Sequence, residues 1–151
     1  MSDRPQCAAI ARHLGGGVLH ATLNRPGTLN AIDLPKQDEL GALVAFAADD
    51  DQTRVMVLTG AGKAFCAGGS FELLDAIMSD YAVRKRIMRE ARDLAFNVIS
   101  CSKPIVSAMH GPAVGAGLVA GLLADISVVG RTARISDGHT RLGVTAGDHA
   151  A

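Results

Sequence analysis

The chain has 151 residues, enough for one compact domain, and its hydrophobic content of 48% is too high for a disordered chain. Fifteen basic residues balance fifteen acidic ones, and the aromatic residues are limited to one Tyr and four Phe. Because the chain has neither a basic field nor a set of aromatic stacking platforms, the sequence argues against a nucleic-acid-binding protein.

The N-terminal part of the chain predicts a hairpin followed by a helix. Residues 8–11 and 18–23 have the composition of strands and flank three consecutive glycines at 15–17, which predicts a β-hairpin with a glycine turn. Asp33 is placed to cap a helix that has Pro35 in its first turn. Apolar residues then follow at helical spacing: Leu40, Leu43, Val44 and Ala47.

Further along the chain, apolar strands alternate with helical patterns. The short apolar run 55–58 predicts a strand buried on both faces. Apolar residues at helical spacing from 72 to 100 predict one long helix, whose polar side is basic. Three more elements are expected: a buried strand at 105–109, a small apolar helix at 116–123 and a strand at 126–129. This alternation predicts an α/β fold with parallel strands.

The end of the chain contains turn residues but no pattern that would close a domain. We detect no repeat, low-complexity tract or linker anywhere in the sequence. We therefore expect one unit, residues 1–151, that is the N-terminal part of a larger fold and is apparently truncated at its C-terminus.

The cysteines and histidines follow neither a disulfide pattern nor a metal-binding pattern. Three widely spaced cysteines favour a reducing compartment, and the sequence contains no CxxC or HxxxH pair. The N-terminus lacks the apolar run of a signal peptide, and the longest apolar stretch, residues 113–124, is too short to span a bilayer. We expect a cytoplasmic protein with no metal site and no membrane contact.

Two glycine-rich segments, residues 60–71 and 110–119, each follow a predicted strand and precede a predicted helix. Glycine lets the backbone approach a ligand closely, and the unpaired N–H groups at a helix start carry partial positive charge. Two such N–H groups directed at one oxygen form an oxyanion hole. These segments are therefore the expected site of chemistry.

The sequence of these segments resembles the crotonase (enoyl-CoA hydratase/isomerase) superfamily. The matching motifs occur in the family's order and spacing across nearly the whole chain: residues 22–26, 30–31, 57–69, 103–104 and 111–117. The resemblance implies a crotonase-like spiral of ββα units, usually assembled into homotrimers or hexamers. It also implies an enzyme of fatty acid metabolism, a lyase or an isomerase, that binds an acyl-CoA thioester. Coenzyme A would be part of the substrate, with no covalently bound cofactor.

The same resemblance implies roles for particular residues. The backbone N–H groups of Gly69 and Ala116 would hold the thioester oxygen and stabilise the enolate. Other backbone positions are expected to lie near the coenzyme or its thioester: Asn30, Ala31, Ala67, Gly68, Gly69 and Gly115.

Two positions depart from the pattern of the family's hydratases, which use two glutamates. The first falls on Val119 and the second on His139. Valine cannot move a proton, whereas an imidazole can do so near neutral pH. The sequence thus keeps the oxyanion hole but argues against hydration through two carboxylates. His139 is a candidate acid–base residue, with a purely structural histidine as the alternative. Ser70 replaces a usual Asp and predicts only a changed helix cap.

Two alternative functions remain open. Residues 115–120 satisfy the dinucleotide-binding pattern G-x-G-x-x-A, and Asp137 follows about 20 residues later, which would suit an NAD(P)-binding Rossmann-type protein. Residues 110–114, however, separate the first glycine from the preceding predicted strand, and no second βαβ half follows. A chain without either glutamate is also compatible with a catalytically inactive or truncated subunit that binds CoA thioesters without turnover.

Overall fold

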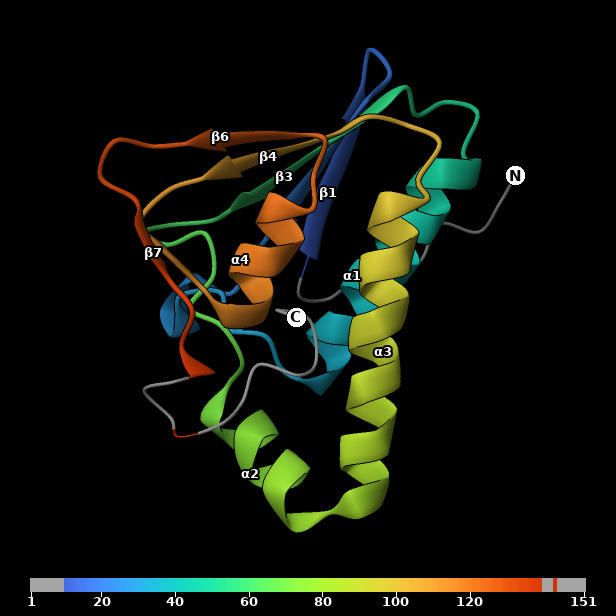
Figure 1. The fold of residues 1–151 in the computed structure, drawn as a ribbon. Coiled ribbons are helices and arrows are strands. Elements are labelled where there is room, and N and C mark those ends of the chain that lie inside the picture. Colours follow the sequence, from blue (N-terminus) through green and yellow to red (C-terminus); the bar gives the residue numbers. More distant parts are fainter. Residues whose placement is uncertain (1–9, 140–142, 144–151) are drawn as a thin grey trace.

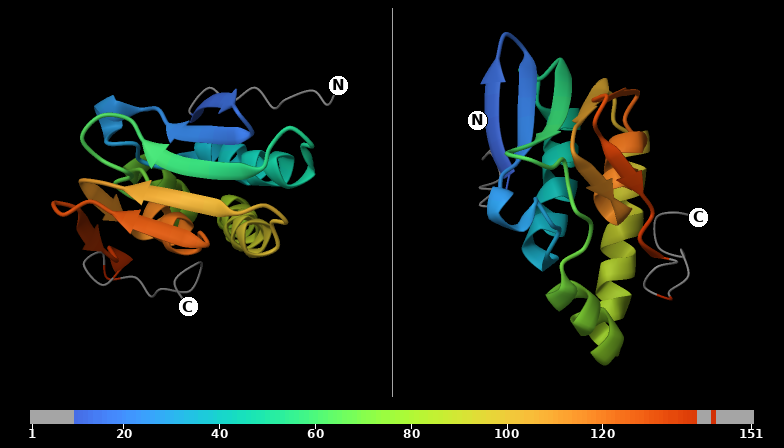
Figure 2. Two further views of the ribbon diagram at one scale, coloured as in Figure 1. Left: turned by 90° about the horizontal axis from the view of Figure 1, so that it is seen from above. Right: turned by 90° about the vertical axis from the view of Figure 1, so that its left-hand side faces the viewer.

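The computed structural model of the protein describes residues 10–139 and 143. Within them, a five-stranded sheet carries the helices on one side, and a second sheet has two strands (Figure 1). Seen from above in the left panel of Figure 2, the strands of the large sheet lie in front of the helices. The described part of the chain has the predicted α/β architecture.

The large sheet begins with the predicted hairpin. Strand β1 (Ile10–Gly15) pairs antiparallel with β2 (Val18–Leu23). The turn lies at Gly16 and Gly17, whose φ angles of 60° and 84° fall in the left-handed region that glycine adopts without strain. The hairpin is confirmed, although its first strand extends further along the chain than the expected residues 8–11.

Helix α1 (Leu34–Asp49) starts where the sequence predicts. The Asp33 carboxylate accepts a hydrogen bond from the backbone N–H of Lys36 at 3.0 Å, and Pro35 occupies the first turn, where its missing N–H costs nothing. The predicted apolar stripe is buried: Leu40, Leu43, Val44 and Ala47.

The remaining strands of the large sheet are parallel, as expected. The sheet has the order β1-β2-β3-β4-β6, in which β3 (Val55–Gly60), β4 (Ile105–Met109) and β6 (Ile126–Val129) run parallel to β2. Strands that run the same way deliver the segments that follow them to the same edge of the sheet. The two glycine-rich segments, which follow β3 and β4, therefore start from one edge.

The expectation that β3 is buried on both faces is wrong. Met56 and Leu58 are buried in one core cluster with residues of α1 and α3 (Tyr81–Ile99), whereas Val55 and Val57, which alternate with them along the strand, are only half-buried. The reason is that the helices of the described chain cover a single face. A continuous apolar run predicts a strand but does not show which of its faces is covered.

The single helix expected from 72 to 100 is also wrong, because the structure has two helices there. They are α2 (Phe71–Ser79) and α3 (Tyr81–Ile99), separated at Asp80. The Asp80 side chain accepts hydrogen bonds from the N–H groups of Ala82 at 2.7 Å and Val83 at 3.3 Å. Asp80 thus caps the start of α3 and competes with a continuous helix through this position. The break lets α2 extend away from α3 (Figure 1).

A short second sheet completes a repeated ββα arrangement. Strand β5 (Pro112–Val114) follows β4 and leads into α4 (Gly115–Leu122), while β7 (Arg134–Ser136) follows β6 and pairs parallel with β5. The segment after β3 joins the same ladder through a bridge between Cys66 and Ala113. Each repeat therefore contributes one strand to the large sheet and one extended segment to the small one, which is the expected spiral.

No helix among residues 10–139 is both long enough and apolar enough to cross a membrane.

Candidate active site

The small sheet brings the two glycine-rich segments into register. The N–H of Cys66 donates to the carbonyl of Pro112 at 3.1 Å, and the N–H of Val114 donates to the carbonyl of Cys66 at 2.9 Å. Cys66 is thereby aligned with Ala113. Three residues beyond each of these positions lie Gly69 and Ala116, the two residues predicted to form the oxyanion hole.

The N–H of Gly69 is directed away from the neighbouring loop. Ile32 forms hydrogen bonds with the residues before and after Gly69. Its N–H donates to the carbonyl of Gly68, and its carbonyl accepts from the N–H of Ser70, each at 2.7 Å. The alternating geometry of a parallel bridge turns the N–H of Gly69 to the opposite side. Within the described part of the chain, no carbonyl accepts from it.

The N–H of Ala116 lies in the first turn of α4. In a continuous helix this N–H would donate to the carbonyl four residues earlier, that of Pro112. That carbonyl already accepts a hydrogen bond from the N–H of Cys66. Val114, at the N-cap, provides no capping side chain. The first N–H groups of a helix have no partner inside the helix and carry partial positive charge. Ala116 therefore presents a donor at a positive helix end.

Close contacts fix α4 against the first glycine-rich segment. Gly117 leaves no space for a side chain, because a Cβ there would lie 2.3 Å from Sγ of Cys66. The Cys66 thiol is fully buried and donates to the carbonyl of Asn30 at 3.1 Å, and burial raises its pKa. This cysteine has a packing role, and its raised pKa keeps it a poor nucleophile.

We expect Gly117→Ala to lower the free energy of unfolding by about 1–3 kcal/mol, because the added methyl group overpacks the contact with Cys66. Gly41→Ala is the matched control: Gly41 lies in the interior of α1, and a Cβ there meets nothing within 4 Å. The control should gain about 0.5–1 kcal/mol. Urea unfolding of both variants tests this expectation, and equal stability of the two would contradict it.

Asn30 supports the site from within the protein. Its side chain is fully buried, and Nδ2 donates to the carbonyls of Ala61 at 2.9 Å and Ala64 at 2.8 Å. Its Oδ1 accepts from the N–H of Arg25 at 2.9 Å. Because these bonds engage the whole amide, contact between Asn30 or the adjacent Ala31 and a coenzyme would have to come from the backbone.

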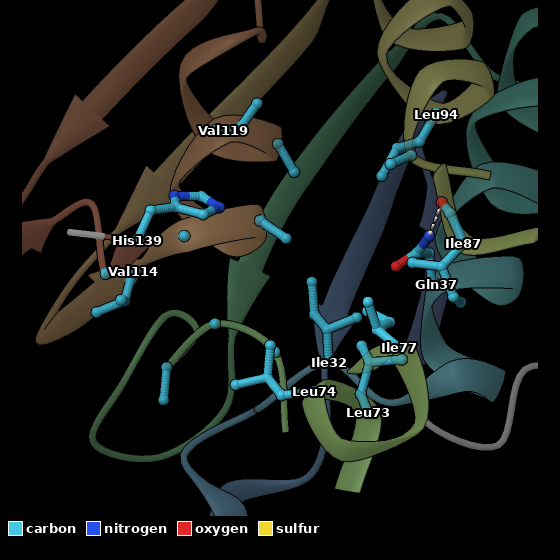
Figure 3. Close-up of a pocket in the computed structure, with 18 of the residues that line it drawn as sticks. Ile32, Gln37, Leu73, Leu74, Ile77, Ile87, Leu94, Val114, Val119 and His139 are labelled. Carbon is cyan, nitrogen blue, oxygen red and sulfur yellow. Dashed lines mark hydrogen bonds between the residues drawn. The ribbon is translucent and has the colours of Figure 1, made fainter. Parts of the chain in front are cut away.

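A pocket of about 140 Å³ lies between the two glycine-rich segments and helices α2, α3 and α4 (Figure 3). Gly69 and Ala116 both line it, as do the predicted coenzyme contacts Ala67, Gly68 and Gly115. The wall is otherwise almost wholly aliphatic: Ile32, Leu73, Leu74, Ile77, Ile87, Ala91, Leu94, Ala95, Val114, Val119, Ala120 and Leu123. Gly69 and Ala116 thus both border an apolar cavity.

His139 reaches the same pocket from the third repeat. The pairing of β5 with β7 aligns Val114 with Ser136, and His139 follows three residues later. Its ring contacts the Asp137 carboxylate through Nδ1 and points into the pocket on the side where Val119 lies (Figure 3). Only 14% of the side chain is exposed. The two positions that replace the glutamates therefore line one cavity.

The family model for enoyl-CoA hydratase/isomerase matches residues 13–150. The chain belongs to this family. A probable enoyl-CoA hydratase of Mycobacterium tuberculosis is 37% identical over 126 residues, which cover 83% of this chain and 48% of that protein. The chain spans about half the length of the curated relatives it matches.

Solved structures of the enoyl-CoA hydratase/isomerase family have the same fold. The crystal structure of an enoyl-CoA hydratase/isomerase from Mycobacterium paratuberculosis superimposes with a TM-score of 0.90 at 34% identity, covering 94% of this chain and 57% of that one. A putative enoyl-CoA hydratase from Streptomyces coelicolor A3(2) gives a TM-score of 0.91 at 32% identity, covering 99% and 55%. These matches favour the hydratase/isomerase family over the dinucleotide-binding alternative.

Two buried polar side chains at the start of α1 were not anticipated. Lys36 is fully buried, its Nζ donates to the carbonyl of Ala31 at 2.7 Å, and burial lowers its pKa. Gln37 is 6% exposed and lines the pocket. Both precede Leu40 at helical spacing, so they lie on the same face of α1 as its apolar stripe, and this face is buried. No cluster of potential metal ligands occurs among the described residues.

Proposed function

We propose that the protein is an acyl-CoA enzyme that holds the thioester carbonyl between the N–H groups of Gly69 and Ala116 and stabilises the enolate formed from it. The supporting observation is that Gly69 and Ala116, from two segments far apart in the sequence, both line one apolar pocket. Main-chain donors held in a rigid framework stabilise negative charge as it develops, without reorganising during the reaction.

The acyl chain would occupy the aliphatic pocket, where each buried methylene contributes about 0.8 kcal/mol. The coenzyme part of the bound thioester would extend from the pocket along the backbone of Ala67 and Gly68, next to Gly115. The backbone at Asn30 and Ala31 would approach it from the neighbouring loop. In this proposal residues 1–151 form an acyl-CoA-binding core, and coenzyme A is part of the substrate rather than a bound cofactor.

His139 would move the proton. Asp137 holds one ring nitrogen, which orients the imidazole towards the pocket. In the proposed step the imidazole removes a proton from the α-carbon, and the electron pair moves onto the thioester oxygen held by Gly69 and Ala116. Val119 offers no second proton. The residues therefore favour enolate chemistry with one proton-moving group, such as isomerisation, over hydration through two carboxylates.

We also propose assembly into a homotrimer or hexamer in the cytoplasm, acting in fatty acid metabolism. Support for assembly comes from β6, whose residues are all exposed although three of its four are apolar: Ile126, Val128 and Val129. An exposed apolar strand at the edge of a sheet is typical of a surface that another segment or subunit covers.

The proposed function is tested by incubating the protein with crotonyl-, 3-enoyl- and malonyl-type CoA thioesters in D₂O and identifying the products by mass. Enolate chemistry predicts deuterium at the α-carbon. CoA affinity without exchange or turnover would instead favour an inactive binding subunit. Hydride transfer to a nicotinamide would contradict the proposal.

Val119→Glu should raise the rate of crotonyl-CoA hydration by about 10²-fold or more, because it restores a carboxylate on the pocket wall. Val119→Gln is the matched control, since it has the same length but cannot exchange a proton. The measurement is loss of enoyl absorbance under saturating substrate. Equal rates for the two variants, or hydration by the unmodified protein at the rate of a two-glutamate enzyme, would show that Val119 does not limit the reaction.

A further inference from the structure

Gln37 is the one polar side chain of α1 among the residues that line the pocket. It lies on the side opposite His139, beside Ile87 (Figure 3). At 6% exposure it is almost fully removed from solvent, and the side chains around it are aliphatic. A buried amide in such surroundings needs partners for both its donor and its acceptor atoms.

A hydrogen bond to α3 fixes the direction of the amide. Nε2 of Gln37 donates to the backbone carbonyl of Ile87 at 3.1 Å. A carbonyl can only accept, so the amide nitrogen must face Ile87 and the amide oxygen must face away from it. In Figure 3 this oxygen points into the pocket. This hydrogen bond between α1 and α3 gives the amide nitrogen of Gln37 a partner, but it gives none to the amide oxygen.

No described residue donates a hydrogen bond to Oε1 of Gln37. Apart from His139, Gln37 is therefore the one side chain with an acceptor oxygen or nitrogen that the described residues place in the wall of this pocket, and the side chains around it are suited to hydrocarbon. A bound alkyl chain would displace water from this oxygen and leave it unpaired, which opposes binding. A bound acyl chain with a hydroxyl group next to Oε1 of Gln37 would instead donate a hydrogen bond to this oxygen.

We infer that Gln37 selects acyl groups that carry a hydroxyl group or a similar hydrogen-bond donor on the part of the chain remote from the thioester. This inference rests on the proposed function, because it assumes that the pocket receives an acyl-CoA chain. It adds the substrate class: ω-hydroxylated or mid-chain-hydroxylated acyl-CoA thioesters. The hydroxyl group meant here lies beyond the carbons that take part in enolate chemistry.

The test compares pairs of saturated CoA thioesters in which a terminal hydroxyl group replaces a methyl group. Suitable pairs are 4-hydroxybutanoyl- and pentanoyl-CoA, 5-hydroxypentanoyl- and hexanoyl-CoA, and 6-hydroxyhexanoyl- and heptanoyl-CoA. Dissociation constants are measured by calorimetry. We expect the hydroxyl compound of at least one pair to bind about 10-fold more tightly or better, since a buried acceptor is left unpaired by the methyl compound.

Gln37→Met is the informative variant, because it keeps the length of the side chain and removes the acceptor. It should reverse the preference within the same pair. Gln52→Met is the matched control, because it makes the same replacement at an exposed position that does not line the pocket, and it should keep the preference for the hydroxyl compound. If the methyl compounds bind as well as the hydroxyl compounds in every pair, this inference is overturned while the proposed function stands. If no CoA thioester binds at all, the proposed function itself fails.

Discussion

Replacing Ala116 with proline should lower kcat by about 10²- to 10³-fold on any CoA thioester that the protein turns over. Proline removes one of the two N–H groups that we propose to hold the thioester oxygen, and the loss of one such donor costs about 3–4 kcal/mol of transition-state stabilisation. The substitution breaks no helical hydrogen bond, because Ala116 is in the first turn of α4, but the proline ring also restricts Gly115, whose φ angle is 51°, so the fold of the variant has to be checked. Substrate binding should weaken much less than kcat.

Ala116→Ser is the control for this experiment, since it adds a side chain at the same place but keeps the N–H. It should retain most of the activity. Circular dichroism of both variants shows whether the fold is kept. A folded Ala116→Pro protein with unchanged turnover would mean that the Ala116 N–H does not act on the reacting oxygen.

Replacing His139 with alanine should lower kcat by about 10²- to 10⁴-fold while substrate binding survives, because general acid–base help is typically of that size. The position supports this role, since the ring lies at the pocket wall with Asp137 holding one of its nitrogens. The measurement is a pH–rate profile with the best substrate from the CoA panel. The rate of the unmodified protein should depend on pH through a single ionisation, and His139→Ala should lose that dependence.

His139→Gln separates shape from proton transfer, because it keeps a polar side chain of similar reach that does not titrate. It should be as impaired as His139→Ala. If His139→Ala keeps the normal kcat and the same profile, the histidine only packs against the pocket, and another residue moves the proton. Asp137→Asn should keep the ring in the pocket but bind it less firmly, with an intermediate loss of activity.

Much of the fold could be predicted because its signals are local. The glycine turn at 16–17, the Asp33 cap of α1 and the apolar runs of β3, β4 and β6 each depend on neighbouring residues. Asp80 was missed because the apolar spacing on either side of it continues the same helical pattern, and only its side-chain cap marks the break. The strands β5 and β7 are three residues each, too short to show a period.

The candidate site was predictable in part for a related reason. The two glycine-rich segments could be recognised as the site of chemistry because each follows a predicted strand, whereas Gly69 and Ala116 were named by the resemblance to the crotonase superfamily. The register that aligns Cys66 with Ala113 depends on a single bridge between distant segments and could not be inferred. The inward direction of Gln37 was missed because it depends on the carbonyl of Ile87, 50 residues away. A polar residue on an apolar helical face was the available signal.

The central claim is that Gly69 and Ala116 together polarise a thioester carbonyl, and infrared spectroscopy of the bound carbonyl tests it without depending on turnover. A saturated acyl-CoA labelled with ¹³C at the thioester carbonyl is bound to the protein, and the difference between labelled and unlabelled spectra isolates the C=O stretch. Two converging donors predict a band at lower frequency than in free acyl-CoA, with the shift reduced in Ala116→Pro. A carbonyl band at the same frequency in the bound and free thioester, under conditions where binding is saturated, would contradict the oxyanion hole.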